Sequence, residues 1–177
     1  MRIISLLPVG RLDRALLEPL AEGLTQRLRV ACSIQPDGLE AEFAFNPLRR
    51  QYHSSEILKK ILHKHPEANL KVLGVTDMDL YIPVLTFVFG EAQLADGGAV
   101  VSAHRLRQEF YGLPADPELL HERLLKESLH ELGHTFGLRH CPDYTCVMSA
   151  SHGVERIDLK QAEFCLACAQ ALPFSQP

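Results

Sequence analysis

Apolar residues in the first part of the chain follow two patterns. Residues 2–8 carry four apolar side chains in a short run, which is typical of a buried strand. Residues 30–34 form a second such run and predict another strand, with Cys32 as a small buried apolar residue inside it. Between them, leucines at every fourth position predict one helical stripe, namely Leu12, Leu16, Leu20, Leu24 and Leu28. Pro19 lies within this stripe and marks a nearby helix start or a kink.

A loop and a second helix are predicted next. Residues 43–52 contain Pro47 and the pair Arg49-Arg50, and we expect a loop there. Ser54 is placed to cap a helix that ends before Pro66. The two arginines could meet a peptide carboxylate, or they could belong to a solvated, salt-bridged surface.

Three further strands are expected in the middle of the chain. Residues 70–76 are apolar on both faces, which is typical of a central strand covered on both sides. Residues 85–92 alternate and predict a strand broken by Gly90. The turn Gly97-Gly98 then leads to a strand over residues 99–103, so this pair is predicted to form a hairpin. Strands that alternate with helices indicate an α/β fold.

The longest helix begins at Asp116-Pro117, with Asp as the cap and Pro at the first helical position. Its core stripe consists of Leu125, Leu129, Leu132 and Phe136. His130 and His134 lie about a quarter turn from that stripe. This offset indicates that the two histidines face a site beside the core and are not packed within it.

Composition narrows the class of protein. A chain of 177 residues with 46% hydrophobic and 23% charged residues is one ordinary globular domain. The formal charge of −4 gives no case for a nucleic acid or an anionic membrane as partner. We find no apolar run long enough to span a bilayer, and residues 1–7 are too short for a signal peptide. Five cysteines, four of them in metal-ligand spacing, fit a reducing compartment, so we expect a cytoplasmic protein.

Residues 130–140 form the pattern H-E-x-x-H-x-x-G-x-x-H. Histidines four positions apart on a helix share one face, so His130 and His134 can bind one Zn²⁺. Gly137 can adopt the left-handed conformation that ends a helix, after which the chain brings His140 to the same ion. Three protein ligands leave one zinc position open, as in catalytic sites. Glu131 is expected beside the metal, where it can take a proton from water and pass it to the leaving amine of a cleaved peptide bond.

Four cysteines follow the histidine motif at metal-ligand spacing. Cys141, Cys146, Cys165 and Cys168 read C-x4-C-x18-C-x2-C. Such a set predicts a closed structural zinc site, which would bring the total to two zinc ions per chain. Because His140 and Cys141 are adjacent, their side chains point in opposite directions in an extended segment and join the two sites. A redox pair at the C-x-x-C is the competing interpretation.

These motifs resemble the archaemetzincin family. The resemblance rests on the extended histidine motif followed directly by Cys141, on Cys146-Val147-Met148, and on the distal C-x-x-C. Residues 46–52 and 74–77 are softer matches. The resemblance implies a metzincin-like fold in which residues 1–137 end with the active-site helix and residues 138–177 form a smaller part. It also implies that Met148 supports the metal site from below, and that residues 85–92 border a cleft in which an extended peptide binds.

Several alternatives remain beside this hypothesis of a monomeric zinc metallopeptidase. The family resemblance makes an aminopeptidase the second mode of action. A zinc-stabilised binding protein is disfavoured by the intact Glu131, and a nuclease by the absence of a basic surface. Asp77 and Asp79 could bind Ca²⁺ or simply form a turn. Tyr144 or His152 could assist at the metal, since Ser149 follows Met148 where some metzincins have a tyrosine.

Overall fold

A five-stranded sheet forms the centre of the computed structural model, which describes residues 3–67 and 70–173. The strand order is β2-β1-β5-β8-β7, in which β1 (Ile3–Pro8), β2 (Ala31–Ile34), β5 (Leu70–Thr76) and β8 (Gly98–Ser102) run parallel. The edge strand β7 (Gly90–Ala92) is antiparallel to β8, with Gly90 opposite Val101. The predicted hairpin is therefore confirmed.

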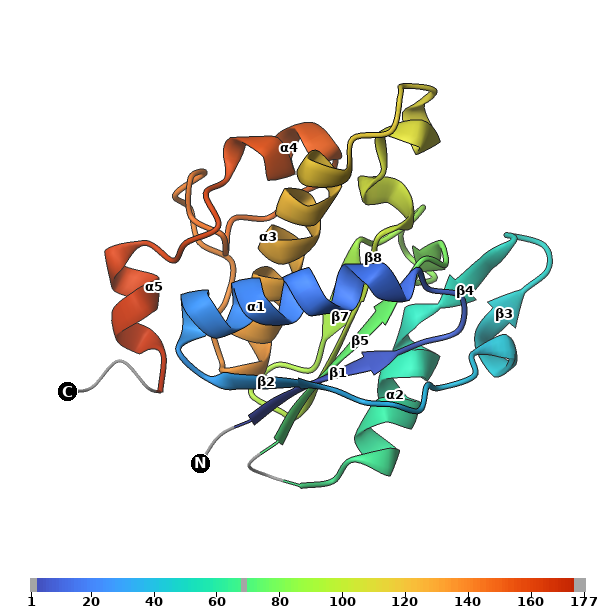
Figure 1. Cartoon of the computed structure of the whole chain (residues 1–177), viewed down its shortest axis with the longest axis horizontal. Coiled ribbons are helices and arrows are strands. Elements are labelled where there is room, and N and C mark those ends of the chain that lie inside the picture. Colours follow the sequence, from blue (N-terminus) through green and yellow to red (C-terminus); the bar gives the residue numbers. More distant parts are fainter. Residues whose placement is uncertain (1–2, 68–69, 174–177) are drawn as a thin grey trace.

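Helices cover both faces of this sheet. Alternate strand residues such as Ile4 and Leu73 share one buried cluster with α1 (Leu17–Leu28) and α3 (Pro117–Thr135). The intervening residues, among them Val72, pack on the opposite face against α2 (Ser54–Lys64). Figure 1 shows α1 crossing the sheet with α3 beside it. The apolar pattern of residues 70–76 thus reflects a strand covered on both sides, as expected.

A C-terminal segment packs against the end of α3. It carries two short helices, α4 (Val154–Leu159) and α5 (Leu166–Ala171), which lie at the opposite end of the molecule from residues 45–53 (Figure 1). Ion pairs attach it to the two long helices, namely Arg123–Asp158, Lys160–Glu127 and Arg27–Glu163. In the part of the chain that the structure describes, no helix combines the length and the apolarity needed to cross a membrane.

The predicted loop at residues 43–52 is wrong. It contains two strands, β3 (Phe45–Asn46) and β4 (Gln51–His53), which form the small sheet with β6 (Leu80–Tyr81). The side chain of Asn46 accepts hydrogen bonds from the N–H groups of Leu48 and Arg49, so the turn at Pro47 is only the tip of a hairpin. Four 3-10 segments complete the fold: Arg14–Leu16, Glu42–Ala44, His104–Leu106 and Gln108–Tyr111.

Two expected helix caps have different outcomes. Asp116 caps α3 as predicted, because its Oδ1 accepts the N–H of Leu119 at 2.9 Å. Ser54 does not cap α2, and the prediction is wrong. Its buried hydroxyl donates instead to the Tyr81 carbonyl and to the Glu91 carboxylate, at 3.1 and 2.5 Å. This serine therefore joins α2 to its neighbouring strands.

The strand predicted over residues 85–92 is shorter than expected. Only Gly90–Ala92 pairs with β8, so Gly90 begins the strand and does not break it. Leu85 donates its N–H to the Ile82 carbonyl at 3.1 Å, which closes a turn before the strand. The carbonyls of Leu85 and Thr86 both accept from Arg49, whereas consecutive carbonyls of a strand point in opposite directions. A side chain from another sheet therefore bends this segment.

Candidate metal centres and active site

The three motif histidines meet at the C-terminal end of α3. His130 is buried, His134 is half-buried and His140 is exposed on the loop that follows. One ring nitrogen from each lies within 4.8 Å of the others. Gly137 adopts φ +95°, and the Leu138 N–H bonds to the Gly133 carbonyl at 3.0 Å. This left-handed residue ends the helix and turns the chain back, as the sequence predicts.

Hydrogen bonds at the Nδ1 atoms fix the orientation of the His130 and His134 rings. The Nδ1 atoms of His130 and His134 lie 2.9 and 2.8 Å from the carbonyl oxygens of Val147 and Leu138. Because a carbonyl only accepts, both Nδ1 atoms carry the proton and both Nε2 atoms keep a lone pair. These two Nε2 atoms are 3.1 Å apart. Lone pairs at that distance repel each other unless a proton or a cation lies between them.

The surroundings of the histidines disfavour a proton between the two Nε2 atoms. Burial lowers the pKa of His130 well below its ordinary value, and the nearby charge of Lys160 lowers it further. Burial is also the main reason for the lowered pKa values of His134 and His140. A tetrahedral zinc ion with Zn–N bonds of about 2.0–2.1 Å has N–N edges of about 3.3–3.4 Å. The three imidazoles therefore fit a zinc ion.

Glu131 is buried directly beside the histidines. Its side chain is only 6% exposed, and burial together with the charges of Glu127 and Glu91 raises its pKa well above the ordinary value. The edge strand packs against it so closely that a Cβ on Gly90 would lie 2.7 Å from the Glu131 Cγ. Only glycine at position 90 leaves this carboxylate room on the cleft side of α3.

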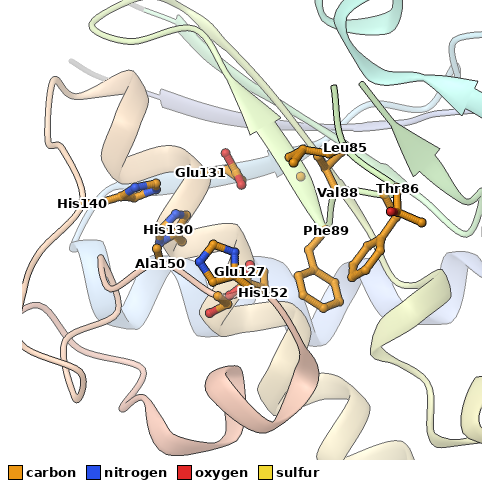
Figure 2. Close-up of a pocket in the computed structure, with 13 residues that line it drawn as sticks. Leu85, Thr86, Val88, Phe89, Glu127, His130, Glu131, His140, Ala150 and His152 are labelled. Atoms are coloured by element: carbon orange, nitrogen blue, oxygen red, sulfur yellow. The ribbon is translucent and has the colours of Figure 1, made fainter. Parts of the chain in front are cut away.

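A cleft of about 340 Å³ opens at this point between α3 and the segment before β7. Figure 2 shows Glu131, His130 and His140 on one side and Leu85, Val88 and Phe89 on the other. Thr86, Phe87 and Gly90 also belong to the latter wall, and Glu127, Ala150, Ser151 and His152 complete the lining. The cleft thus places an apolar wall opposite the histidines and the buried carboxylate.

A buried ion pair lies next to the histidine site. Lys160 Nζ is 3.1 Å from Glu127 Oε1, and their side chains are 1% and 4% exposed. Glu127 lies one helical turn before Glu131, so its carboxylate shares the cleft-facing side of α3. That spacing was visible in the sequence, whereas nothing in the sequence marked Lys160 as its partner. Sequence reasoning missed both residues.

The four predicted cysteines also come together. Their sulfur atoms lie within 4.8 Å of one another, all four are free thiols, and Cys141 Sγ is 3.8 Å from Cys165 Sγ. A tetrahedral ion with Zn–S bonds of about 2.3 Å has S–S edges of about 3.8 Å. Backbone N–H groups of Met148 and Cys165 point at Cys146 Sγ, at 3.5 and 3.3 Å, and would favour its thiolate. This donor set fits a closed zinc site and not an isolated C-x-x-C pair.

Met148 is fully buried below the histidine helix. Its sulfur lies so close to Gly133 that a Cβ there would collide with it. The N–H of Cys141 donates to the Met148 carbonyl at 2.9 Å, so the methionine, the third histidine and the first cysteine belong to one hydrogen-bonded turn. This hydrogen bond therefore links the two groups of candidate metal ligands.

Other candidate residues are placed elsewhere. Asp77 and Asp79 form ion pairs with Arg107 and Arg105, each at 2.7 Å, and they belong to neither of the two ligand groups found among the described residues. Cys32 lies apart from the other cysteines, and burial raises its pKa to about 11. Tyr144 is exposed and does not line the cleft. His152 does line it, so it alone of the two suggested auxiliary residues faces the site.

Comparisons with known proteins agree with this picture. A model of peptidase family M54 matches residues 38–173. The archaemetzincin of Thermococcus kodakarensis is 40% identical over 178 residues, which cover 97% of this chain and 96% of that protein. That of Methanocaldococcus jannaschii is 40% identical and covers 96% and 92%.

Solved structures give the same result for the fold. A zinc-dependent peptidase from Methanocorpusculum labreanum superimposes with a TM-score of 0.87 at 34% identity, over 95% of this chain and 98% of the other. The archaemetzincin of Archaeoglobus fulgidus gives a TM-score of 0.83 at 35% identity, over 96% and 99%. The chain therefore belongs to peptidase family M54, that of the archaemetzincins, and is a zinc metallopeptidase.

Proposed function

We propose that His130, His134 and His140 hold the catalytic zinc ion and that Glu131 is the general base in peptide-bond hydrolysis. One observation carries this assignment: two Nε2 lone pairs face each other at 3.1 Å, beside a buried carboxylate on the wall of a cleft. When bound, zinc supplies a Lewis acid that polarises the substrate carbonyl and lowers the pKa of a water molecule.

Glu131 moves the protons in this proposal. One of its carboxylate oxygens accepts a proton from the attacking water, and the same oxygen then gives that proton to the leaving nitrogen of the substrate. Burial disfavours the ionised form of Glu131, and a zinc ion at the neighbouring histidines would offset this by favouring the charged carboxylate. The neighbouring charge of Glu127 would hinder the ionised form further, but that charge is paired with Lys160.

We further propose that Cys141, Cys146, Cys165 and Cys168 hold a second, structural zinc ion, which makes two ions per chain. The distance of 3.8 Å between two of these sulfurs supports this count. In this arrangement Gly137 directs the chain back towards the site, and the turn from His140 to Met148 transmits the rigidity of the cysteine site to the third histidine.

The finer features of the fold are proposals as well. We assign a metzincin-like arrangement, with residues 1–137 and 138–177 on either side of the cleft and Met148 as the support below the histidines. Five free cysteines support a reducing, cytoplasmic location. We also propose a monomeric enzyme, in which one chain supplies all three histidines and Glu131.

The cleft favours the interior or the extended part of a peptide over its free N-terminus. An aminopeptidase needs an acidic group to bind the substrate ammonium. Of the two acidic groups near Glu131, Glu127 pairs with Lys160, and Glu91 accepts hydrogen bonds from Ser54 and Ser55. Aminopeptidase action is therefore the second candidate, and a latent binding protein the third. Neither nucleic acid nor a membrane enters the proposal as a partner.

Metal removal tests this function directly. The chain is treated with a chelator and then reloaded with zinc, and a mixed peptide library is incubated with each form and read by mass spectrometry. The proposal predicts cleavage by the reloaded protein only, with cut sites inside peptides. Removal of single N-terminal residues would favour the aminopeptidase mode, and no cleavage by a fully zinc-loaded chain would favour latency.

A further inference from the structure

The apolar wall of the cleft is not held by regular strand pairing. Residues 85–87 precede β7 and make no ladder with β8, yet they line the cleft opposite the histidines. We propose that Arg49 is a positioning residue for peptide binding. It fixes the apolar wall by donating hydrogen bonds to the backbone carbonyls of that wall. This inference rests on the proposed peptidase function. It assigns a role in peptide binding to a residue outside the histidine motif.

Arg49 reaches the wall from the small second sheet. Its Nη2 donates to the carbonyl of Leu85 at 2.6 Å and to that of Thr86 at 3.3 Å. Its Nε donates to Gln51 Oε1 at 3.1 Å, and its guanidinium carbon lies 4.1 Å from the centre of the Tyr81 ring. All of these contacts require a planar group with several donors, which arginine offers and lysine does not. The half-buried Arg49 side chain therefore has its partners within the protein and is not free to bind a substrate carboxylate.

A network of polar side chains also binds the same segment. Gln51 donates its amide to the Thr86 carbonyl and to Asp79 Oδ2, both at 3.0 Å. Asp79 in turn pairs with Arg105, whose guanidinium carbon lies 4.3 Å from the centre of the Phe87 ring. The backbone of the wall is thus attached to Gln51 of the second sheet, and its Phe87 side chain contacts Arg105 of the 3-10 segment His104–Leu106.

This attachment has a consequence for substrate binding. With the carbonyls of Leu85 and Thr86 directed at Arg49, the apolar side chains of the wall border the cleft. Leu85 is 50% exposed and Phe87 is half-buried, so neither is held in place by the core alone. Without the arginine, the Leu85 carbonyl would lose its side-chain partner. The segment from Ile82 to Val88 would then be held by its turn, the bridge to Leu80, the Gln51 bond to Thr86 and the Phe87 ring contact. A peptide would then have to order the wall when it binds, which weakens its affinity.

The chain offers a matched pair of variants. Arg49→Lys keeps the positive charge but removes the planar group, whereas Arg50→Lys makes the same change at the neighbouring exposed arginine. Zinc-loaded wild type and both variants are compared by hydrogen exchange read by mass spectrometry over residues 82–88. The N–H groups of Leu85 and Val88 are the reporters, since they donate to the carbonyls of Ile82 and Leu80. We expect at least tenfold faster exchange in Arg49→Lys and wild-type exchange in Arg50→Lys.

Steady-state cleavage of a library-derived peptide supplies the second readout. We expect KM to rise at least fivefold in Arg49→Lys, with kcat within twofold of wild type and zinc content unchanged. Unaltered exchange, or altered exchange without a change in KM, would overturn the proposal. If Arg49→Lys does not fold, Gln51→Met removes part of the same network and must show smaller shifts in the same direction. If wild type cleaves no peptide, the proposed function fails, and the exchange rates still decide whether Arg49 holds the wall.

Discussion

The buried ion pair between Lys160 and Glu127 offers a quantitative test of how the C-terminal segment supports the active-site helix. Lys160→Met keeps the length of the side chain and removes its charge. Glu127 is 4% exposed, so the variant leaves a carboxylate buried without its partner at 3.1 Å. Breaking a buried pair in this way costs about 3–5 kcal/mol in the free energy of unfolding. At about 2–4 °C per kcal/mol for a domain of this size, the melting temperature should fall by roughly 6–20 °C.

The double variant Glu127→Leu/Lys160→Met is the control. It removes both charges and restores apolar packing, so its stability should be close to wild type or higher by about 1–4 kcal/mol. Chemical denaturation of the three proteins at constant zinc concentration measures these free energies. A double variant as unstable as Lys160→Met would show that the lost stability came from packing and not from the unpaired charge.

The same pair predicts a dependence on pH. Burial raises the pKa of Glu127, and the charge of Lys160 holds it lower than burial alone would. In Lys160→Met this pKa rises further. A group whose pKa is raised on folding contributes stability that is present below its unfolded pKa and is lost as the pH rises through its folded pKa. The deficit of Lys160→Met relative to wild type should therefore be smaller at pH 5 than at pH 8, and an equal deficit at both would contradict the assignment.

Three further experiments test the glycine beside Glu131, the cysteine site and the burial of Cys32. Gly90→Ala places a methyl group 2.7 Å from the Glu131 Cγ and from the Val100 carbonyl, so we expect kcat to fall at least tenfold while atomic absorption still finds zinc. Unchanged kcat would mean that the edge strand does not constrain Glu131. Cys146→Ser should reduce the zinc content from two ions to one or fewer and lower peptide cleavage, whereas Cys32→Ser should change neither. In zinc-free protein at pH 8, iodoacetamide should label Cys32 more slowly than Cys165, because burial raises the pKa of Cys32 to about 11 whereas hydrogen bonds, first that of the Cys168 backbone, lower the pKa of Cys165; equal labelling would contradict this.

The two groups of candidate metal ligands could be predicted from the sequence because they depend on local spacing. On a helix, residues 130 and 134 share a face, and Gly137 allows the turn that returns His140. The four cysteines needed only to be counted. The buried strand over residues 70–76 and the Asp116 cap follow from equally local rules, and the structure contains both.

The remaining features depend on contacts between distant residues. The apolar alternation over residues 85–92 indicated a strand, but Arg49 binds two consecutive carbonyls and bends its first half. Ser54 had the position of a cap, but Glu91 takes its hydroxyl. No sequence pattern around Lys160 indicates its role, because that role arises only when the side chain packs against Glu127. Two of these differences concern residues that line the cleft, namely the segment that Arg49 binds and Glu127, and the histidine motif gives no information about either.

In the proposed mechanism, Glu131 transfers the protons of peptide hydrolysis beside a zinc ion held by three histidines. Glu131→Gln keeps the size of the side chain and a bound metal but cannot accept a proton. Kinetic cleavage of one library-derived peptide by zinc-loaded wild type and by this variant tests this mechanism directly, with zinc content determined on the same samples. We expect equal zinc content and a loss of about 10²–10⁴-fold in kcat. Equal kcat in the two proteins would contradict the mechanism.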